Sequence, residues 1–273
     1  MTEPLKLLCT LAHPDDESMG TGPLLAKYSA QGVQAHLICA TRGERGWSGP
    51  QDQYPGLTGL GKIRQAELLA SAQVLGVHQV HFLDYIDGDL VKADPLQGIA
   101  KLTSHIRRIR PQVVVTFDPE GAYGHPDHIT ISQWTAAAIL CAADPAYQAG
   151  YQAGDAPPHR VSKLYYFVDA KALVKLINDL GADISFEVDG KVRTWEGWPD
   201  WAITARIDAG DYCSTVWEAI QCHKSQTGWI IDMLKDAPPD TACRIWGEQS
   251  LYRVFSLVSH DNQIETDLFE GLR

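Results

Sequence analysis

Short apolar runs alternate with segments of helical periodicity through the first half of this 273-residue chain, and this alternation constrains the fold most. The apolar runs have the length of strands, and the segments between them repeat apolar residues three or four apart. Strands are expected at residues 5–11, 33–40, 79–83 and 113–117, and helices at 22–30, 62–75, 99–109 and 128–143. This rhythm predicts an α/β fold with a Rossmann-like, mostly parallel sheet and helices on both faces.

Two stretches of the first half carry further expectations. Residues 41–61 are rich in glycine and are expected to form a long loop above the sheet edge. The helix after this loop is expected to end at Gly76, and to bury a face made of Ile63, Ala66, Ala70 and Val74.

The second half is less regular. We expect one domain in which residues 1–143 form the core with the functional site, and residues 144–273 complete the sheet and the pocket. The expected elements are a surface excursion at 144–158, strands at 164–168, 202–207 and 252–257, a helix at 212–223, and a β-hairpin at 185–194 that turns at Asp189-Gly190. The aromatic run at 195–201 is interpreted as a packed cover, with a stacking surface for a sugar or for an apolar arm of the substrate as the alternative.

The formal net charge of −11 argues against nucleic acid or an anionic membrane as the main partner, since both require a basic surface. No apolar stretch is long enough to span a bilayer, and no signal peptide is visible, so a cytoplasmic protein is expected. Six cysteines are scattered without a Cys-x-x-Cys pair. They are interpreted as small buried side chains in a reducing compartment rather than as disulfides or ligands.

The segment Ala12–Glu17 reads Ala-His-Pro-Asp-Asp-Glu and follows the first expected strand. His13 and Asp16 are three residues apart on a turn that enters a helix, so both side chains can face one point, as two ligands of a divalent metal must. Asp15 is then left over. A carboxylate that lies beside a metal without binding it is what a hydrolase needs to deprotonate water.

A second motif, Gly124-His125-Pro126-Asp127-His128, also follows a strand and precedes a helix. His128 is the candidate third ligand. His125 is the candidate donor to an oxyanion, and Asp127 could orient the imidazole of His125. Each motif alone is equally well explained as a helix cap or a turn. Two motifs of the same architecture at one sheet edge favour a metal site.

In these two motifs the sequence resembles the LmbE-like or PIG-L de-N-acetylases, which remove acetyl groups from N-acetylglucosamine-containing molecules. The resemblance covers mainly residues 5–140. It implies that His13, Asp16 and His128 hold zinc, with iron(II) as the alternative, and that Asp15 is the general base.

The same resemblance implies a role for three further residues. Tyr123 would add a hydroxyl donor to the reacting oxygen, with an ordinary loop aromatic as the alternative. Arg64 and Asp87 would contact the polar groups of a small N-acetylglucosaminyl substrate, although Arg64 and Glu67 could also form a surface pair.

Several interpretations remain open at this point. A larger amide, such as a thiol-cofactor conjugate or an antibiotic glycoside, could be the substrate. Two histidines and a carboxylate can also hold iron(II) for oxygen chemistry, but no cosubstrate site is apparent. A sugar-binding protein without catalysis is the third alternative, against which the intact Asp15 counts. A homo-oligomer is compatible with the sequence, and nothing in it decides the point.

Overall fold

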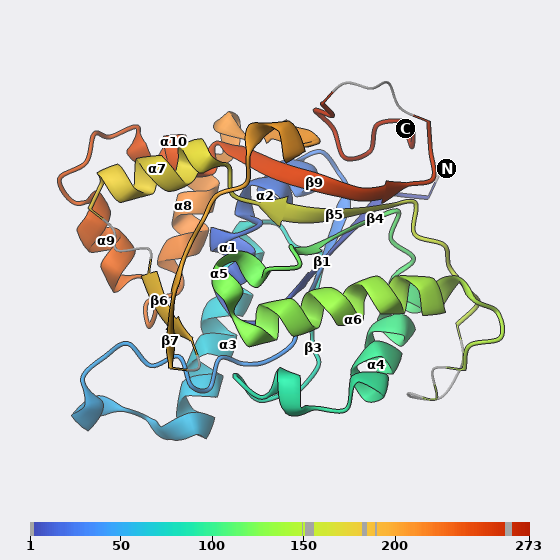
Figure 1. Ribbon diagram of the computed structural model, residues 1–273, viewed down its shortest axis with the longest axis horizontal. Coiled ribbons are helices and arrows are strands. Elements are labelled where there is room, and N and C mark those ends of the chain that lie inside the picture. The colour runs from blue at the N-terminus through green and yellow to red at the C-terminus, as the bar shows by residue number, and fades with distance from the viewer. Residues whose placement is uncertain (1–2, 149, 151–155, 182–184, 189, 260–263) are drawn as a thin grey trace.

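The computed structural model describes residues 3–148, 150, 156–181, 185–188, 190–259 and 264–273. Its centre is a seven-stranded sheet in the order β3-β2-β1-β4-β5-β9-β8 (Figure 1). The strands are β1 (Lys6–Leu11), β2 (Gln34–Cys39), β3 (Gln79–Phe82), β4 (Val113–Phe117), β5 (Lys163–Val168), β8 (Ala205–Asp208) and β9 (Glu248–Ser256).

The first five strands are parallel, while β9 runs antiparallel to β5 and β8 antiparallel to β9. The strand β4 is buried at every position, as a central parallel strand of Val and Phe should be. The predicted Rossmann-like α/β sheet is therefore confirmed. Because β1 has β2 on one side and β4 on the other, the order of strands reverses between β1 and β4.

Helices cover both faces of this sheet (Figure 1). On one side α4 packs on α6, and on the other α2 and α3 pack against α8. The helices are α1 (Asp16–Met19), α2 (Gly22–Ala30), α3 (Gly56–Val74), α4 (Pro95–Ile109), α5 (Gly121–Gly124), α6 (Pro126–Ala143), α7 (Lys171–Asp179), α8 (Cys213–Gln221), α9 (Gly228–Leu234) and α10 (Thr241–Trp246). Among the described residues, no helix combines the length and the apolarity needed to cross a membrane.

The helix α3 corrects two expectations. It begins at Gly56 rather than at residue 62, so Leu60 lies inside the helix, one turn after its start, and is buried in the core. Its buried face contains Leu60, Arg64 and Leu68, whereas Ile63 is exposed. The apolar pattern was misleading because the buried side chain at the middle of this face is an arginine, held by polar partners. Gly76, with φ +72°, follows the helix as predicted.

In the second half, the hairpin of β6 (Ser185–Val188) and β7 (Lys191–Thr194) is confirmed, and its predicted turn residue Asp189 lies outside the described residues. The helices α7, α9 and α10 were not predicted. The strand β9 begins at Glu248, four residues before the expected start, and β8 begins at Ala205. Part of the expected excursion at 144–158 also lies outside the described residues.

One disulfide corrects the interpretation of the cysteines. Cys213 at the start of α8 is bonded to Cys243 in α10, 30 positions away in the sequence. Cys9 and Cys39 are free and buried in strands, as expected. The sequence offered no sign of the pairing, because the helix α10 that presents Cys243 was not predicted.

Candidate metal centre and active site

Both sequence motifs lie at the carboxyl edge of the sheet, where the strand order reverses. The Ala12–Glu17 segment leaves β1, and the segment that ends in His128 leaves the neighbouring strand β4. Ligands of open α/β sheets bind at such a reversal, because the loops diverge there and leave a crevice. The topology therefore brings the two motifs together across 115 positions of sequence.

The three predicted metal ligands converge on one point. His13 Nδ1 lies 3.2 Å from His128 Nε2 and 3.7 Å from Asp16 Oδ2, and His128 Nε2 lies 3.5 Å from Asp16 Oδ1. Zinc–nitrogen bonds of about 2.0–2.1 Å in a tetrahedron set ligand atoms roughly 3.3 Å apart. The donor set thus fits a divalent cation in both chemistry and spacing.

The other nitrogen of each histidine faces a protein oxygen. His128 Nδ1 is 3.3 Å from the carbonyl of Gly121, and His13 Nε2 is 3.1 Å from Asp87 Oδ1 and 3.2 Å from Asp127 Oδ2. These contacts leave His128 Nε2 and His13 Nδ1 as the nitrogens with lone pairs for a metal. The ring of Phe117 stacks on that of His128, with 3.9 Å between the ring centroids.

Two other groups of potential ligands occur among the described residues, and both include His13. One combines His13 with His125 and His128, and the other combines His13 with Asp87 and Asp127. In the second group Asp127 already accepts backbone N–H bonds from Gly88 (2.7 Å) and Leu90 (3.1 Å). We therefore interpret the two carboxylates as partners that orient His13.

Asp15 lies beside this set with an unusual backbone. Its φ of 115° is in the region that L-residues rarely adopt, and its carboxylate accepts a hydrogen bond of 3.0 Å from Arg64 Nη2. Burial raises the pKa of Asp15 above its ordinary value, and the charge of Arg64 partly reverses that shift. Asp15 also lines the main pocket, together with the predicted ligands Asp16 and His128.

Arg64 is only 3% exposed, and the glycine-rich loop after β2 encloses it. Its guanidinium donates to the carbonyls of Pro14 (2.5 Å) and Gly43 (3.0 Å) as well as to Asp15. A Cβ atom at Gly43 or Gly46 would overlap this guanidinium. The glycines at positions 43 and 46 are therefore explained by the close approach of the arginine.

A buried ion pair between Glu17 and His223 supports the turn that carries Asp15. Glu17 and His223 are both fully buried, with 2.5 Å between Glu17 Oε1 and His223 Nε2, and Ser71 Oγ also donates to Oε1. The second oxygen of Glu17 accepts the backbone N–H of Asp15 at 3.0 Å. Sequence reasoning missed this network, since Glu17 and His223 lie 206 positions apart and no local pattern joins them.

His125 and Tyr123 lie close to the two histidine ligands. His125 caps helix α6, where its Nδ1 accepts the backbone N–H of Asp127 at 3.2 Å, and its ring lies 4.7 Å from that of His13. The carboxylate of Asp127, which we expected to orient His125, instead contacts His13. Tyr123 lines the pocket, and its ring packs edge-on against His128 at 5.4 Å.

Arg64 and Asp87, the two predicted substrate contacts, are both buried, and neither lines the main pocket. Asp87 faces His13, and its second oxygen accepts the backbone N–H of Arg45 at 3.2 Å. The structure thus gives both residues contacts within the protein, and their contact with a substrate stays a prediction. Arg64 and Glu67 do not form the expected surface pair, because Glu67 accepts two hydrogen bonds from Ser225 instead.

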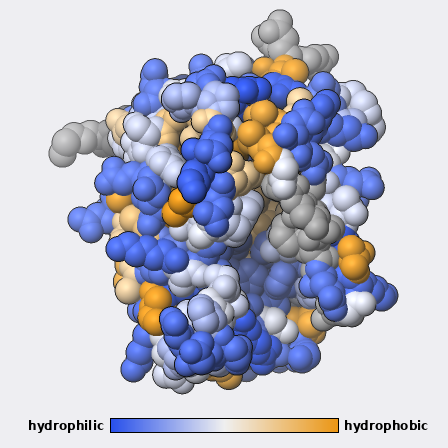
Figure 2. All heavy atoms as spheres, turned by 90° about the vertical axis from the view of Figure 1, so that its left-hand side faces the viewer, coloured by the Kyte–Doolittle hydropathy of each residue, from blue (hydrophilic) through white to orange (hydrophobic). Residues whose placement is uncertain are grey.

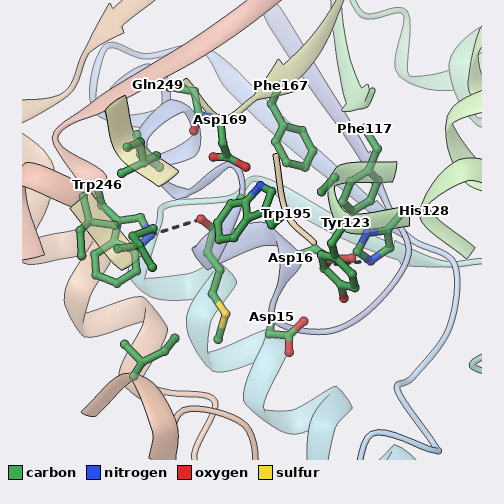
Figure 3. A pocket seen from close by; sticks show the side chains of 18 of the residues that line it. Asp15, Asp16, Phe117, Tyr123, His128, Phe167, Asp169, Trp195, Trp246 and Gln249 are labelled. Atoms are coloured by element: carbon green, nitrogen blue, oxygen red, sulfur yellow. Dashed lines mark hydrogen bonds and ion pairs between the residues drawn. The ribbon is translucent and has the colours of Figure 1, made fainter. Parts of the chain in front are cut away.

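A pocket of about 340 Å³ opens onto Asp15, Asp16 and His128 (Figure 3). This volume is in the range of small-molecule sites, roughly 300–1,000 Å³. Trp195 from the aromatic run lines the pocket, whereas Trp198 packs on Tyr252 and donates to Asp118 (2.7 Å). Trp198 thus packs as a cover, as predicted, whereas Trp195 forms part of the pocket wall, and its contact with a substrate stays a prediction.

A two-histidine, one-carboxylate set with a further carboxylate at hand, next to a small-molecule pocket, is the arrangement of a metal-dependent hydrolase. Comparison with known proteins agrees with that class. A family model described as PIG-L, GlcNAc-PI de-N-acetylase, matches residues 8–139. The 1D-myo-inositol 2-acetamido-2-deoxy-alpha-D-glucopyranoside deacetylase of Thermobifida fusca is 33% identical over 81% of this chain and 83% of its own length.

Two solved structures share the fold. The N,N'-diacetylchitobiose deacetylase of Pyrococcus horikoshii has a TM-score of 0.66 and 21% identity, over 97% of this chain and 88% of its own. The 4-carboxy-2-hydroxymuconate hydratase of Pseudomonas putida has a TM-score of 0.64 and 21% identity, over 94% and 99%. At these identities the likeness shows the fold alone, and the fold also carries a hydratase.

The relative at 33% identity decides the family: this chain belongs to the LmbE-like, PIG-L family, and the protein is a hydrolytic N-deacetylase.

Proposed function

We propose that the protein removes the acetyl group from an N-acetylglucosaminyl unit of a small molecule, with a divalent metal held by His13, Asp16 and His128. The observation that carries this proposal is the position of Asp15, which is clamped by Arg64 beside the three ligands and open to the pocket. The activity named for the Thermobifida fusca relative supports the same substrate class.

We propose zinc as the metal, with iron(II) as the alternative that the same ligands accept. When bound, such a cation supplies Lewis acidity, which lowers the pKa of water and polarises a carbonyl oxygen. Asp87 and Asp127 would keep His13 in the required tautomer, and the carbonyl of Gly121 would do the same for His128.

The reaction consumes one water, breaks the amide C–N bond, and yields acetate and a free amine. Asp15 would take a proton from the attacking water and pass it to the amine nitrogen as the C–N bond breaks. Burial raises the pKa of Asp15, so its conjugate acid forms more readily than that of an exposed aspartate. The positive charge of Arg64 acts in the opposite direction and lowers the pKa of Asp15.

His125 and Tyr123 would donate hydrogen bonds to the oxyanion that forms on the former carbonyl. Because Nδ1 of His125 accepts the N–H of Asp127, the neutral ring carries its hydrogen on Nε2. Burial and the nearby carboxylates Asp16 and Asp15 raise the pKa of Tyr123, so its hydroxyl keeps its proton and can donate.

The test is the release of primary amine from a panel of N-acetylglucosaminyl compounds by the zinc-loaded protein, with Asp15→Asn alongside. Asparagine is preferred to alanine because it tolerates the positive φ of this position better. We expect Asp15→Asn to lower kcat by at least about 100-fold, in the range typical for a general base, while the bound metal stays at one equivalent.

Asp52→Asn, an exposed carboxylate outside the site, is the matched control and should keep full activity. No amine from any member, with metal bound and the fold intact, would count against an N-acetylglucosaminyl substrate and direct the search to larger amides. Full activity of Asp15→Asn would rule out the proposed base.

A further inference from the structure

The pocket continues away from the metal ligands into an apolar region. Opposite His128 and Phe117 in Figure 3 lies Trp246, with Trp195 between them. We call this region the apolar arm and define it by six side chains from three helices: Leu173 and Ile177 of α7, Trp229 and Met233 of α9, and Ile245 and Trp246 of α10.

The helices of the apolar arm gather on one side of the molecule. In Figure 1 the helices α7, α9 and α10 lie together at the left, and Figure 2 looks onto that side and shows a hollow near its centre with hydrophobic side chains above it. Trp229 is 52% exposed, so a large aromatic ring is left in water at the pocket. Apolar surface of this kind is costly in water and is typical of a site that binds an apolar group.

Two polar side chains near the apolar arm have partners inside the protein. Trp246 donates its indole N–H to the carbonyl of Met19 at 3.2 Å, and Gln226 donates to the carbonyl of Gly46 at 2.6 Å. Burial and the charge of Asp118 raise the pKa of Asp169 to about 7, so this pocket carboxyl is largely uncharged under mildly acidic conditions. The six side chains that define the apolar arm offer few hydrogen-bond partners to a polyhydroxylated group, which disfavours the binding of such a group against them.

The apolar arm comes from residues 173–246, outside the segment 8–139 that the family model matches. The metal ligands and Asp15 all lie inside that segment. The metal site and the distal part of the pocket are therefore built by different parts of this chain.

We propose that the substrate carries an apolar alkyl or aromatic group, and that this group binds in the apolar arm while the acetamide lies at the metal site. The inference rests on the proposed deacetylation and names its substrate class more closely. Two attachments share this chemistry: the group can be the aglycone of the amino sugar, or it can be an acyl chain longer than acetyl.

The first experiment measures binding without turnover. Three pocket tryptophans, Trp195, Trp229 and Trp246, provide an intrinsic fluorescence signal. Asp15→Asn protein is titrated with methyl and octyl N-acetylglucosaminide, the octyl compound kept below the concentration at which it forms micelles. Each methylene that leaves water contributes up to about a fourfold gain in affinity. We expect the octyl compound to bind at least about tenfold more tightly, and equal affinity for the two glycosides would overturn the inference whatever the catalytic result.

The second experiment measures amine release by the wild-type enzyme from four substrates: the methyl and octyl N-acetylglucosaminides, the inositol glycoside, and the methyl glycoside of N-octanoylglucosamine. A kcat/KM highest for the octyl glycoside assigns the apolar group to the aglycone, and one highest for the N-octanoyl compound assigns it to the acyl chain. A preference for the inositol glycoside would overturn the inference and leave the deacetylase proposal intact. The deacetylase proposal fails instead if no amine is released while the octyl glycoside still binds.

A pair of tryptophan variants tests the location. Trp229→Ala should lower the ratio of octyl to methyl affinity by about tenfold, because it removes one wall of the apolar arm. Trp201→Ala is the matched control, since Trp201 is 87% exposed and lies outside the pocket. If both variants changed the ratio equally, or neither did, the apolar group would not bind in the apolar arm.

Discussion

Asp15 illustrates how single residues set the chemistry of this site. The backbone of Asp15 has a positive φ, and its N–H donates to the carboxylate of Glu17. The carboxylate of Asp15 accepts a hydrogen bond from Arg64. Neither Glu17 nor Arg64 belongs to the proposed set of metal ligands, and neither was predicted to contact Asp15. Strained backbone that is fixed from several sides is typical of functional positions, where it keeps a side chain in one orientation.

Arg64→Gln tests this electrostatic contact at the residue scale. The positive charge of Arg64 lowers the pKa of Asp15, so its removal should raise that pKa. The acidic limb of the kcat/KM profile, which reports deprotonation of the base, should then move to higher pH by roughly one unit. The measurement is a pH profile of amine release between pH 5 and 9.

Arg64→Lys is the control that keeps the charge and loses the planar guanidinium. It should lower kcat while leaving the acidic limb near its original pH. An acidic limb that is unchanged in Arg64→Gln would contradict the assignment of Asp15 as the titrating base.

At the scale of the elements, the loop between β2 and α3 supports the site through Arg64, although it supplies none of the proposed ligands. The loop was predicted to lie above the sheet edge. It encloses the guanidinium of Arg64 there and accepts a hydrogen bond from it through the carbonyl of Gly43. Gly46 has no side chain because the guanidinium occupies that space, and Arg64 is fixed by three acceptors that resist its displacement.

Gly46→Ala should therefore displace Arg64 from Asp15. We expect kcat to fall by at least about tenfold, with a change in unfolding free energy on the order of 1 kcal/mol. Gly228→Ala is a suitable control, because a Cβ there meets open space. The measurements are amine release and urea unfolding, and a Gly46→Ala enzyme as active as Gly228→Ala would refute the steric argument.

At the scale of the whole molecule, the ion pair of Glu17 and His223 joins the turn after β1 to the region just after α8, across 206 positions of sequence. Burial alone would raise the pKa of Glu17, but His223 more than reverses this and lowers it. Burial alone would lower the pKa of His223, but Glu17 more than reverses this and raises it. The pair thus links the turn that carries Asp15 and Asp16 to the C-terminal half of the chain, which carries the apolar arm.

The signs of these two shifts define a pH window. The contribution of Glu17 is present above its ordinary pKa of 4.5 and is lost as the pH falls through its lowered value. The contribution of His223 is complete below its ordinary pKa of 6.5 and is lost as the pH rises through its raised value. The pair should stabilise the protein most between about pH 4.5 and 6.5.

Glu17→Gln should accordingly lower the unfolding free energy by about 3 kcal/mol at pH 5.5, because a buried charge loses its partner, and by less at pH 9.5. Urea unfolding with a metal chelator present separates this effect from metal loss. Asp179→Asn, which breaks the exposed pair with Lys175, should cost no more than about 0.5 kcal/mol at either pH. An equal cost of Glu17→Gln at both pH values would show that the pair is not charged.

The sequence by itself determined the parallel sheet and the edge at which the site lies. Strand patterns such as Val113–Phe117 are local, and parallel strands bring the turns that follow them to one edge, so His13 and His128 could be placed together without coordinates. Only the tertiary structure decided what surrounds them. A buried Arg64 resembles a solvent-facing residue in sequence, Asp127 orients His13 rather than His125, and Glu17 meets His223 from the far end of the chain. Such contacts depend on how distant elements pack, which local periodicity does not encode, and the apolar arm built by α7, α9 and α10 is of the same kind.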